Sequence, residues 1–175
     1  CRNYSEFSTA HHRLDTVETA VEELGLFKQH GGQAMIDLNL PDIYRDPLGL
    51  RRISRTTGVH VVMGCGFYVA AAHPPALADW SEEQIAAMIV ADIVEGAAAE
   101  EESRSTGKGV VHRRNTGVRA GVIGEIVCSS PLHDDERKCL RAAARAQRQT
   151  GATVFVHPGR AETAPLEILD QLSSA

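Results

Sequence analysis

The feature that most limits the fold of this chain is the regular alternation of helical and strand-like segments. Predicted strands at 33–40, 59–66, 119–127 and 152–157 alternate with predicted helices in the order αβαβαβαβα. Strict alternation of this kind implies a parallel sheet with right-handed crossover connections. Two architectures satisfy this order. One is an open doubly wound sheet, and the other is part of an eight-stranded (β/α) barrel.

Capping residues predict where several of the helices begin and end. One helix begins near Asp15 and another after Ser81, each with a Glu or Gln three positions later, as in a capping box. A long helix covers about 134–150 and is closed by Gly151. These signals place the crossover helices between the predicted strands.

One stretch does not fit the alternation. Residues 98–114 are strongly charged and have no sustained apolar period. We therefore interpret the chain as a single domain over residues 1–175, with an inserted surface loop at 98–114.

Composition excludes some classes of partner. A net charge of -5, with 18 basic residues, is not the footprint of a nucleic-acid-binding protein. Residues 56–78 carry no charged side chain, but their histidines, glycines and prolines argue against a membrane span. No signal peptide opens the chain, so we expect a cytoplasmic protein. Its four cysteines form no CxxC pair and are expected to be reduced thiols, most of them buried.

Two of the predicted strands end on side chains that bind metals or move protons. The apolar run that starts at Gly121 reaches Glu125, and the run that starts at Thr153 ends at His157. Strands buried on both faces are near-continuous hydrophobic runs, so a lone carboxylate or imidazole is unusual in them. By strict alternation, Glu125 and His157 would each face the inside of a barrel. They would then lie on neighbouring strands, close enough to share one metal site.

The same residues also allow a purely structural interpretation. Glu125 could pair with an arginine, and His157 could be a hydrogen-bonded residue at the end of a strand. His73, which stands beside two prolines in the loop after the second predicted strand, is a further candidate for contact with a substrate.

Several longer strings carry a resemblance to a known family. The strings IYRDPLGLRRISRTTGVHVVMGCGFY, WSEEQIAAMIVADIVEG, RAGVIGEI, RAAARAQRQTGA and VFVHPGR resemble the phosphotriesterase-related proteins of the amidohydrolase superfamily. The similarity covers nearly the whole chain from about Asp15. It implies a (β/α)8 barrel of which this chain supplies about strands 2 to 5 and helices 1 to 5.

The resemblance also implies a metal-dependent hydrolase with two divalent ions, usually zinc. Glu125 matches the carboxylate that bridges the two metals, His157 matches a ligand to one of them, and Tyr68 matches an aromatic that lines the substrate pocket. A metal-bound hydroxide would attack a small-molecule phosphotriester, lactone or N-acyl amide.

The chain also departs from the family pattern. Val127 stands where the family usually has Gly, and the family's other metal-binding histidines and aspartate have no match here. We therefore expect this chain to be incomplete at both ends and inactive by itself, unless a homodimer completes the barrel. A non-catalytic α/β binding or interaction domain that has lost the metal site is the alternative.

Overall fold

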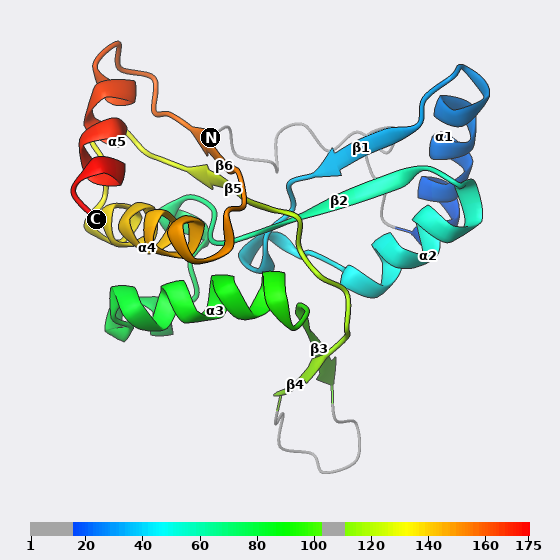
Figure 1. The fold of residues 1–175 in the computed structure, drawn as a ribbon, viewed down its shortest axis with the longest axis horizontal. Coiled ribbons are helices and arrows are strands. Elements are labelled where there is room, and N and C mark those ends of the chain that lie inside the picture. The colour runs from blue at the N-terminus through cyan, green and yellow to red at the C-terminus, as the bar shows by residue number, and fades with distance from the viewer. Residues whose placement is uncertain (1–15, 103–110) are drawn as a thin grey trace. The chain divides into compact units, whose positions relative to one another are not determined.

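The computed structural model describes residues 16–102 and 111–175, and its elements follow the predicted alternation (Figure 1). The helices are α1 (Val17–Gln29), α2 (Pro47–Thr57), α3 (Glu82–Val94), α4 (Asp134–Thr150) and α5 (Ala164–Ser173). The strands are β1 (Ala34–Asp37), β2 (His60–Cys65), β3 (Ala98–Glu102), β4 (Val111–Asn115), β5 (Val122–Val127) and β6 (Val154–His157). Short 3-10 helices occupy Pro41–Ile43, Ala70–Ala72 and Pro75–Asp79.

Sheet topology decides between the two predicted architectures. The larger sheet has the order β1-β2-β5-β6, and its β2–β5 and β5–β6 pairs are parallel. These strands follow one another in chain order, because β3 and β4 belong to a separate sheet. A doubly wound sheet reverses its order at a switch point, whereas a barrel adds each new strand on the same side. The order is therefore that of a partial (β/α) barrel, as predicted.

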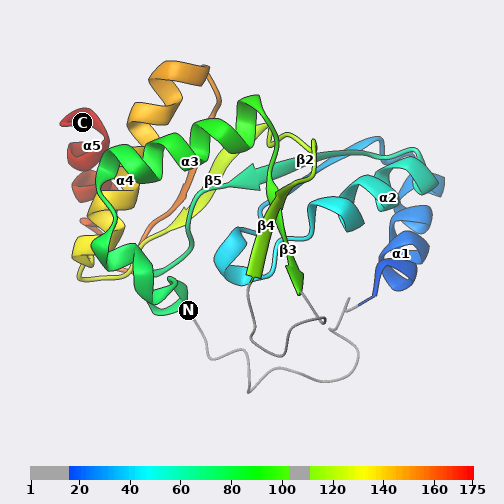
Figure 2. The ribbon, with the colours of Figure 1, turned by 90° about the horizontal axis from the view of Figure 1, so that it is seen from below.

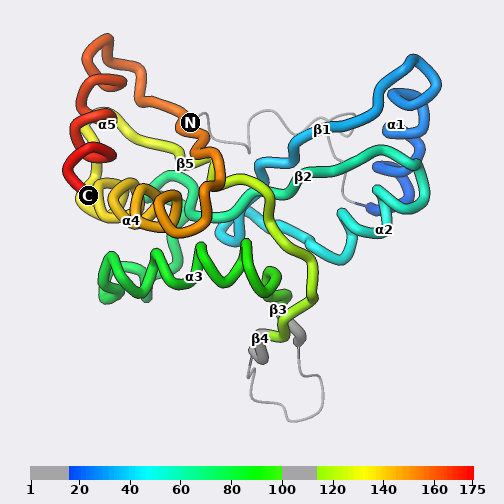
Figure 3. Tube along the Cα trace, in the orientation of Figure 1, coloured from blue at the N-terminus to red at the C-terminus, as the bar shows by residue number. Residues whose placement is uncertain are grey.

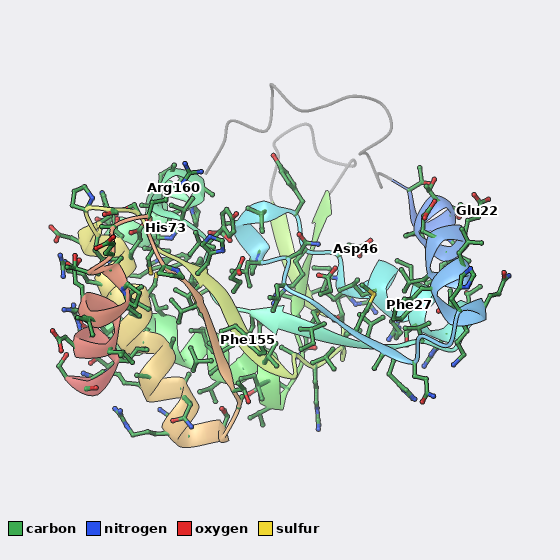
Figure 4. The ribbon with its side chains drawn as sticks, turned by 90° about the horizontal axis from the view of Figure 1, so that it is seen from above. Glu22, Phe27, Asp46, His73, Phe155 and Arg160 are labelled. Carbon is green, nitrogen blue, oxygen red and sulfur yellow. The ribbon has the colours of Figure 1, made fainter. Side chains whose placement is uncertain are left out.

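The chain divides into two compact units. The first combines residues 1–35 with 49–61, and the second combines 36–48 with 62–175. Within the described part of the first unit, Arg52 pairs with Glu18 at 2.7 Å, and Lys28 Nζ donates to the Gly58 carbonyl at 3.1 Å. Its helix α1 buries none of its residues, and Phe27 on that helix is 43% exposed (Figure 4).

The second unit contains the main core. Helix α4 lies between α3 and α5 and also contacts β5 and β6 (Figures 1 and 2). It buries seven of its residues, four of them alanines. Small side chains let the backbones of neighbouring elements approach closely, which is how a helix packs on two others and on strands at once. The fully buried Leu77, Ile85, Ile123 and Leu140 fill the space between these elements.

Most predicted helix ends are confirmed. Ser81 caps α3 with the full capping box, and α4 ends at Gly151, which has φ 72°. The start of α1 differs from the prediction. Thr16, not Asp15, is the N-cap, and its hydroxyl accepts a hydrogen bond from the Thr19 amide at 3.1 Å. Both residue types cap well, so the sequence could not separate two adjacent candidates.

The predicted loop at 98–114 contains regular structure at both of its ends. Strands β3 and β4 pair antiparallel in register from Ala98↔Asn115 to Glu102↔Val111 (Figure 3). The predicted inserted surface segment thus carries a strand at each end, and its being an insertion stays a prediction. In this register Glu100 lies opposite Arg113. Residues 103–110 lie outside the described part of the chain.

Three cysteines in the described residues, Cys65, Cys128 and Cys139, are free and buried, as predicted. Burial raises the pKa of each thiol to about 12, so these side chains stay protonated and behave as small apolar groups. Across the described ranges, no helix combines the length and apolar character that a bilayer crossing needs.

Candidate metal site

Glu125 and His157 meet at the carboxyl edge of the sheet. Nδ1 of His157 lies 3.2 Å from Oε1 of Glu125, and the register pairs Val127 with His157. Because a carboxylate oxygen only accepts, Nδ1 carries the hydrogen in this contact. The Glu125 side chain is 31% exposed and that of His157 is 62% exposed. The structure thus brings together the two residues that the sequence singled out, with both open to solvent.

The path of β5 at this point is less regular than alternation predicts. The pairing of β5 with β6 shifts between Ile123 and Ile126, and Gly124 adopts φ 115°. A Cβ on Gly124 would overlap with the carbonyl oxygen of Phe155 on β6. Only glycine therefore fits where the two backbones approach. The register shift interrupts strict alternation around Glu125, while the strand is buried both before it, at Ile123, and after it, at Ile126 and Val127.

Tyr68 follows β2 at the same edge of the sheet. Its amide donates to Oδ2 of Asp42 at 2.8 Å, and its carbonyl oxygen lies 2.9 Å from Nε2 of His73. His73 was predicted as a possible substrate contact, but in the structure its Nε2 is turned toward its own loop. Because the carboxyl ends of parallel strands lie at one edge of a sheet, Tyr68, Glu125 and His157 all lie at that edge.

Comparison with known proteins identifies the family. The family model for the phosphotriesterase family matches residues 2–175. The chain belongs to the phosphotriesterase family. The resemblance inferred from the sequence is therefore confirmed.

Curated relatives give the same result. N-acetyltaurine hydrolase from Rattus norvegicus is 40% identical over 159 residues, which cover 91% of this chain and 41% of that protein. The protein of the same name from Dictyostelium discoideum is 34% identical over 163 residues, covering 93% of this chain and 40% of the relative. The chain thus spans about two fifths of the length of these relatives.

Solved structures of two bacterial proteins share the fold. A resiniferatoxin-binding protein from Rhodobacter sphaeroides matches with a TM-score of 0.76 and 38% identity, over 92% of this chain and 40% of that one. A phosphotriesterase homology protein from Escherichia coli, complexed with phosphate in its active site, matches with a TM-score of 0.77 and 26% identity, over 93% of this chain and 50% of that one.

The side chains at the edge suit a divalent metal. Zinc in proteins is bound by imidazole nitrogen and carboxylate oxygen at about 2.0–2.2 Å in tetrahedral geometry, which places ligand atoms about 3.3 Å apart. Nδ1 of His157 and Oε1 of Glu125 lie 3.2 Å apart, so one ion could contact both after small adjustments. Among the described residues, no group of three or more His, Cys, Asp or Glu side chains could hold a metal. A complete site therefore needs ligands beyond these two.

A second glutamate, which the sequence analysis missed, holds the loops of this edge in place. Glu136 is 0% exposed, and it accepts hydrogen bonds from the amides of Ala70, Ser129 and His133 and from the Ser129 hydroxyl, at 2.7–3.1 Å. Burial raises the pKa of Glu136, but these donors outweigh it, so the pKa lies below its ordinary value. The signal in the sequence was His133 followed three residues later by Glu136, a capping box that begins with an unusual residue.

A buried ion pair, Arg45 with Asp92, lies next to the carboxyl end of β2. Arg45 Nη1 lies 2.8 Å from Asp92 Oδ2 and donates to the Gly64 carbonyl at 2.9 Å, with only 3% of the Arg45 side chain exposed. These two residues line a cavity of about 340 Å³ together with Phe67 and Met88. Because Asp92 is the ion partner of Arg45, we assign the pair a structural role.

Proposed function

We propose that this chain supplies part of the metal centre of a hydrolase that cleaves N-acyl amides, with Glu125 and His157 as metal ligands. The observation that carries the proposal is the meeting of these two side chains, 3.2 Å apart and open to solvent, at the carboxyl edge of a phosphotriesterase-family sheet. That edge is where (β/α) barrels place their chemistry.

The two residues would hold the metal in different ways. His157 would bind a metal through Nδ1 only after the hydrogen that this nitrogen carries toward Glu125 had moved to Nε2, as in the other neutral tautomer. Glu125 has two carboxylate oxygens, so it is able to contact two ions at once. A divalent metal bound here supplies Lewis acidity toward the scissile carbonyl and acidifies water.

The names of the relatives support one class of substrate. Both curated relatives described above are named N-acetyltaurine hydrolase, and this favours an amide over the phosphotriester and lactone alternatives. N-acetyltaurine joins an acetyl amide to a sulfonate, so its site needs a cation at some distance from the metal. Arg160 is exposed, follows His157 in the same loop, and has no hydrogen bond or ion pair among the residues that the structure describes. Figure 4 places it at the end toward which β6 runs beyond Phe155. Arg160 would bind the sulfonate while Tyr68 lines the acyl side.

Zinc binding by the chain tests the ligand assignment. Titration of the metal-free 175-residue chain should show zinc binding that Glu125→Gln and His157→Ala each weaken at least tenfold, because each removes a ligand. Glu162→Gln, an exposed glutamate in the loop after β6, is the matched control and should bind like the parent. Equal affinity in all four proteins would exclude this site.

Hydrolysis is tested on the full-length protein that contains these residues. N-acetyltaurine should be cleaved faster than a phosphotriester or a lactone, and Arg160→Gln should raise KM for N-acetyltaurine by about tenfold. The same variant should leave KM for an uncharged N-acetyl amide unchanged. Turnover of the phosphotriester alone would contradict the amide assignment.

Binding without catalysis is the second candidate. One observation favours it: the described residues bring together only two metal ligands. The solved relative from Rhodobacter sphaeroides is itself titled a resiniferatoxin-binding protein. If the full-length protein binds no zinc and cleaves none of the three substrate classes, this candidate replaces the hydrolase.

A further inference from the structure

The backbone of Tyr68 is held from both sides by half-buried side chains. Its amide donates to Oδ2 of Asp42 at 2.8 Å, and its carbonyl lies 2.9 Å from Nε2 of His73. A carbonyl oxygen only accepts, so Nε2 of His73 must carry a hydrogen. Asp42 lies in the 3-10 helix after β1, and His73 follows Tyr68 by five residues in the connection between β2 and α3. We call Asp42 and His73 the Tyr68 clamp.

Neighbouring contacts fix the clamp itself. The ring of Phe67, which is 3% exposed, meets the His73 ring edge-on at 6.1 Å and the Trp80 ring at 5.9 Å. On the other side of Tyr68, the Ala70 amide donates to Oε1 of Glu136 at 2.9 Å. The loop is thus tied on both sides of Tyr68, which leaves its backbone little freedom to shift.

Both residues of the Tyr68 clamp bury a polar atom that lacks a hydrogen-bond partner in the described part of the chain, which lowers the stability of the fold. Oδ1 of Asp42 and Nδ1 of His73 are both buried, and neither has a hydrogen-bond partner among the described residues. Burial raises the pKa of Asp42, against the lowering effect of the Tyr68 amide and of His73. A buried polar atom without a hydrogen-bond partner destabilises the folded state. A role in holding Tyr68 accurately would account for one such atom on each of the two segments that contact its backbone, whereas simple loop packing would not.

From this geometry we infer that Asp42 and His73 are positioning residues, which set the fit of the acyl side of the substrate by fixing Tyr68. This inference rests on the proposed function, because Tyr68 is there assigned to the acyl side. The clamp itself does not depend on that assignment. Asp42 and His73 act through the Tyr68 backbone and do not touch the substrate.

Hydrogen exchange tests the clamp independently of activity. In the 175-residue chain, Asp42→Ala should speed exchange of the Tyr68 amide by about tenfold, since it loses a hydrogen bond to a charged acceptor. Asp42→Asn keeps a side-chain oxygen that accepts from the amide and should restore most of the protection. Asp134→Asn, on a fully exposed aspartate, is the control for the loss of charge. Unchanged exchange in Asp42→Ala, with the fold retained, would overturn the clamp.

Kinetics of the full-length protein test the positioning role. Asp42→Ala and His73→Ala should each raise KM for an N-acyl amide about tenfold with a smaller change in kcat, and Asp42→Asn and His73→Gln should recover it. In Tyr68→Ala the added Asp42→Ala should have no further effect on KM, because its effect passes through Tyr68. Additive effects would overturn the inference. If the parent hydrolyses no amide, the proposed function fails and the positioning role fails with it, while the exchange result still decides whether the clamp exists.

Discussion

Glu125 and Glu136 stand on the same β5–α4 segment and have opposite surroundings. Glu136 is 0% exposed, and donors from three residues reach its two oxygens, one at Oε1 and three at Oε2. The Glu125 side chain is 31% exposed, and its hydrogen-bond partner in the described structure is His157. A carboxylate whose lone pairs are used by backbone amides organises loops, whereas one with free lone pairs at an open edge can bind a metal. Residue type alone therefore does not separate a structural glutamate from a functional one.

Replacing Glu136 should produce the largest loss of stability. Glu136→Ala leaves the amides of Ala70, Ser129 and His133 without their acceptor inside the protein, at an expected cost of about 3 kcal/mol or more. The midpoint of urea unfolding measures this. Glu162→Ala, on an exposed residue, should change stability by less than about 0.5 kcal/mol. Equal losses in the two variants would remove the distinction between buried and exposed carboxylates.

A change beside Glu125 should cost less, and for a steric reason. In Gly124→Ala the new Cβ would overlap with the Phe155 carbonyl at a residue with φ 115°, so we expect a loss of about 1–3 kcal/mol. Gly151→Ala is the matched control, because Gly151 also has positive φ, at 72°, but has open space around its Cβ position. Unfolding of both variants in urea measures the difference. A smaller loss for Gly124→Ala than for Gly151→Ala would show that close approach of β5 to β6 is not what requires the glycine.

Lowering the pH should reduce the contribution of Glu136 to the free energy of unfolding. Its folded pKa is lowered, so its stabilising effect is fully present above the unfolded value of about 4.3 and is lost as pH falls through the folded pKa. The stability gap between the parent and Glu136→Gln should stay constant above about pH 5 and narrow below about pH 4. Urea titrations at several pH values measure this gap. A gap that widens in acid would mean that the folded pKa is raised.

The sequence predicted most of the fold because its signals are local. The bounds of α4, the Ser81 capping box and the order of the strands follow from short-range patterns that the structure confirms. It also predicted that Glu125 and His157 would meet, because neighbouring parallel strands end at one edge.

Long-range partners explain what the sequence did not predict. The residues close to Asp42 in the chain do not indicate that its side chain accepts a hydrogen bond from the amide of Tyr68. Likewise, Glu136 accepts from the amide of Ala70, which lies 66 residues earlier in the chain. The strands at 98–102 and 111–115 were missed because the sequence there lacks the apolar period by which strands are predicted.

The smallest effect on stability is expected at Glu125, where the effect on zinc should be large. Glu125→Gln removes a charge from a side chain that is 31% exposed and leaves an amide that can still contact His157, so unfolding in urea should change by less than about 0.5 kcal/mol. Zinc affinity should nevertheless fall at least tenfold, because an amide oxygen is a much weaker ligand than a carboxylate. Glu136→Gln would give the reverse pattern, in which stability is lost and zinc affinity is retained. Its zinc affinity must be measured at a temperature and urea concentration at which the variant is folded. If Glu125→Gln lowered stability as much as Glu136→Gln and left zinc affinity unchanged, Glu125 would be a structural residue and the proposed metal site would be wrong.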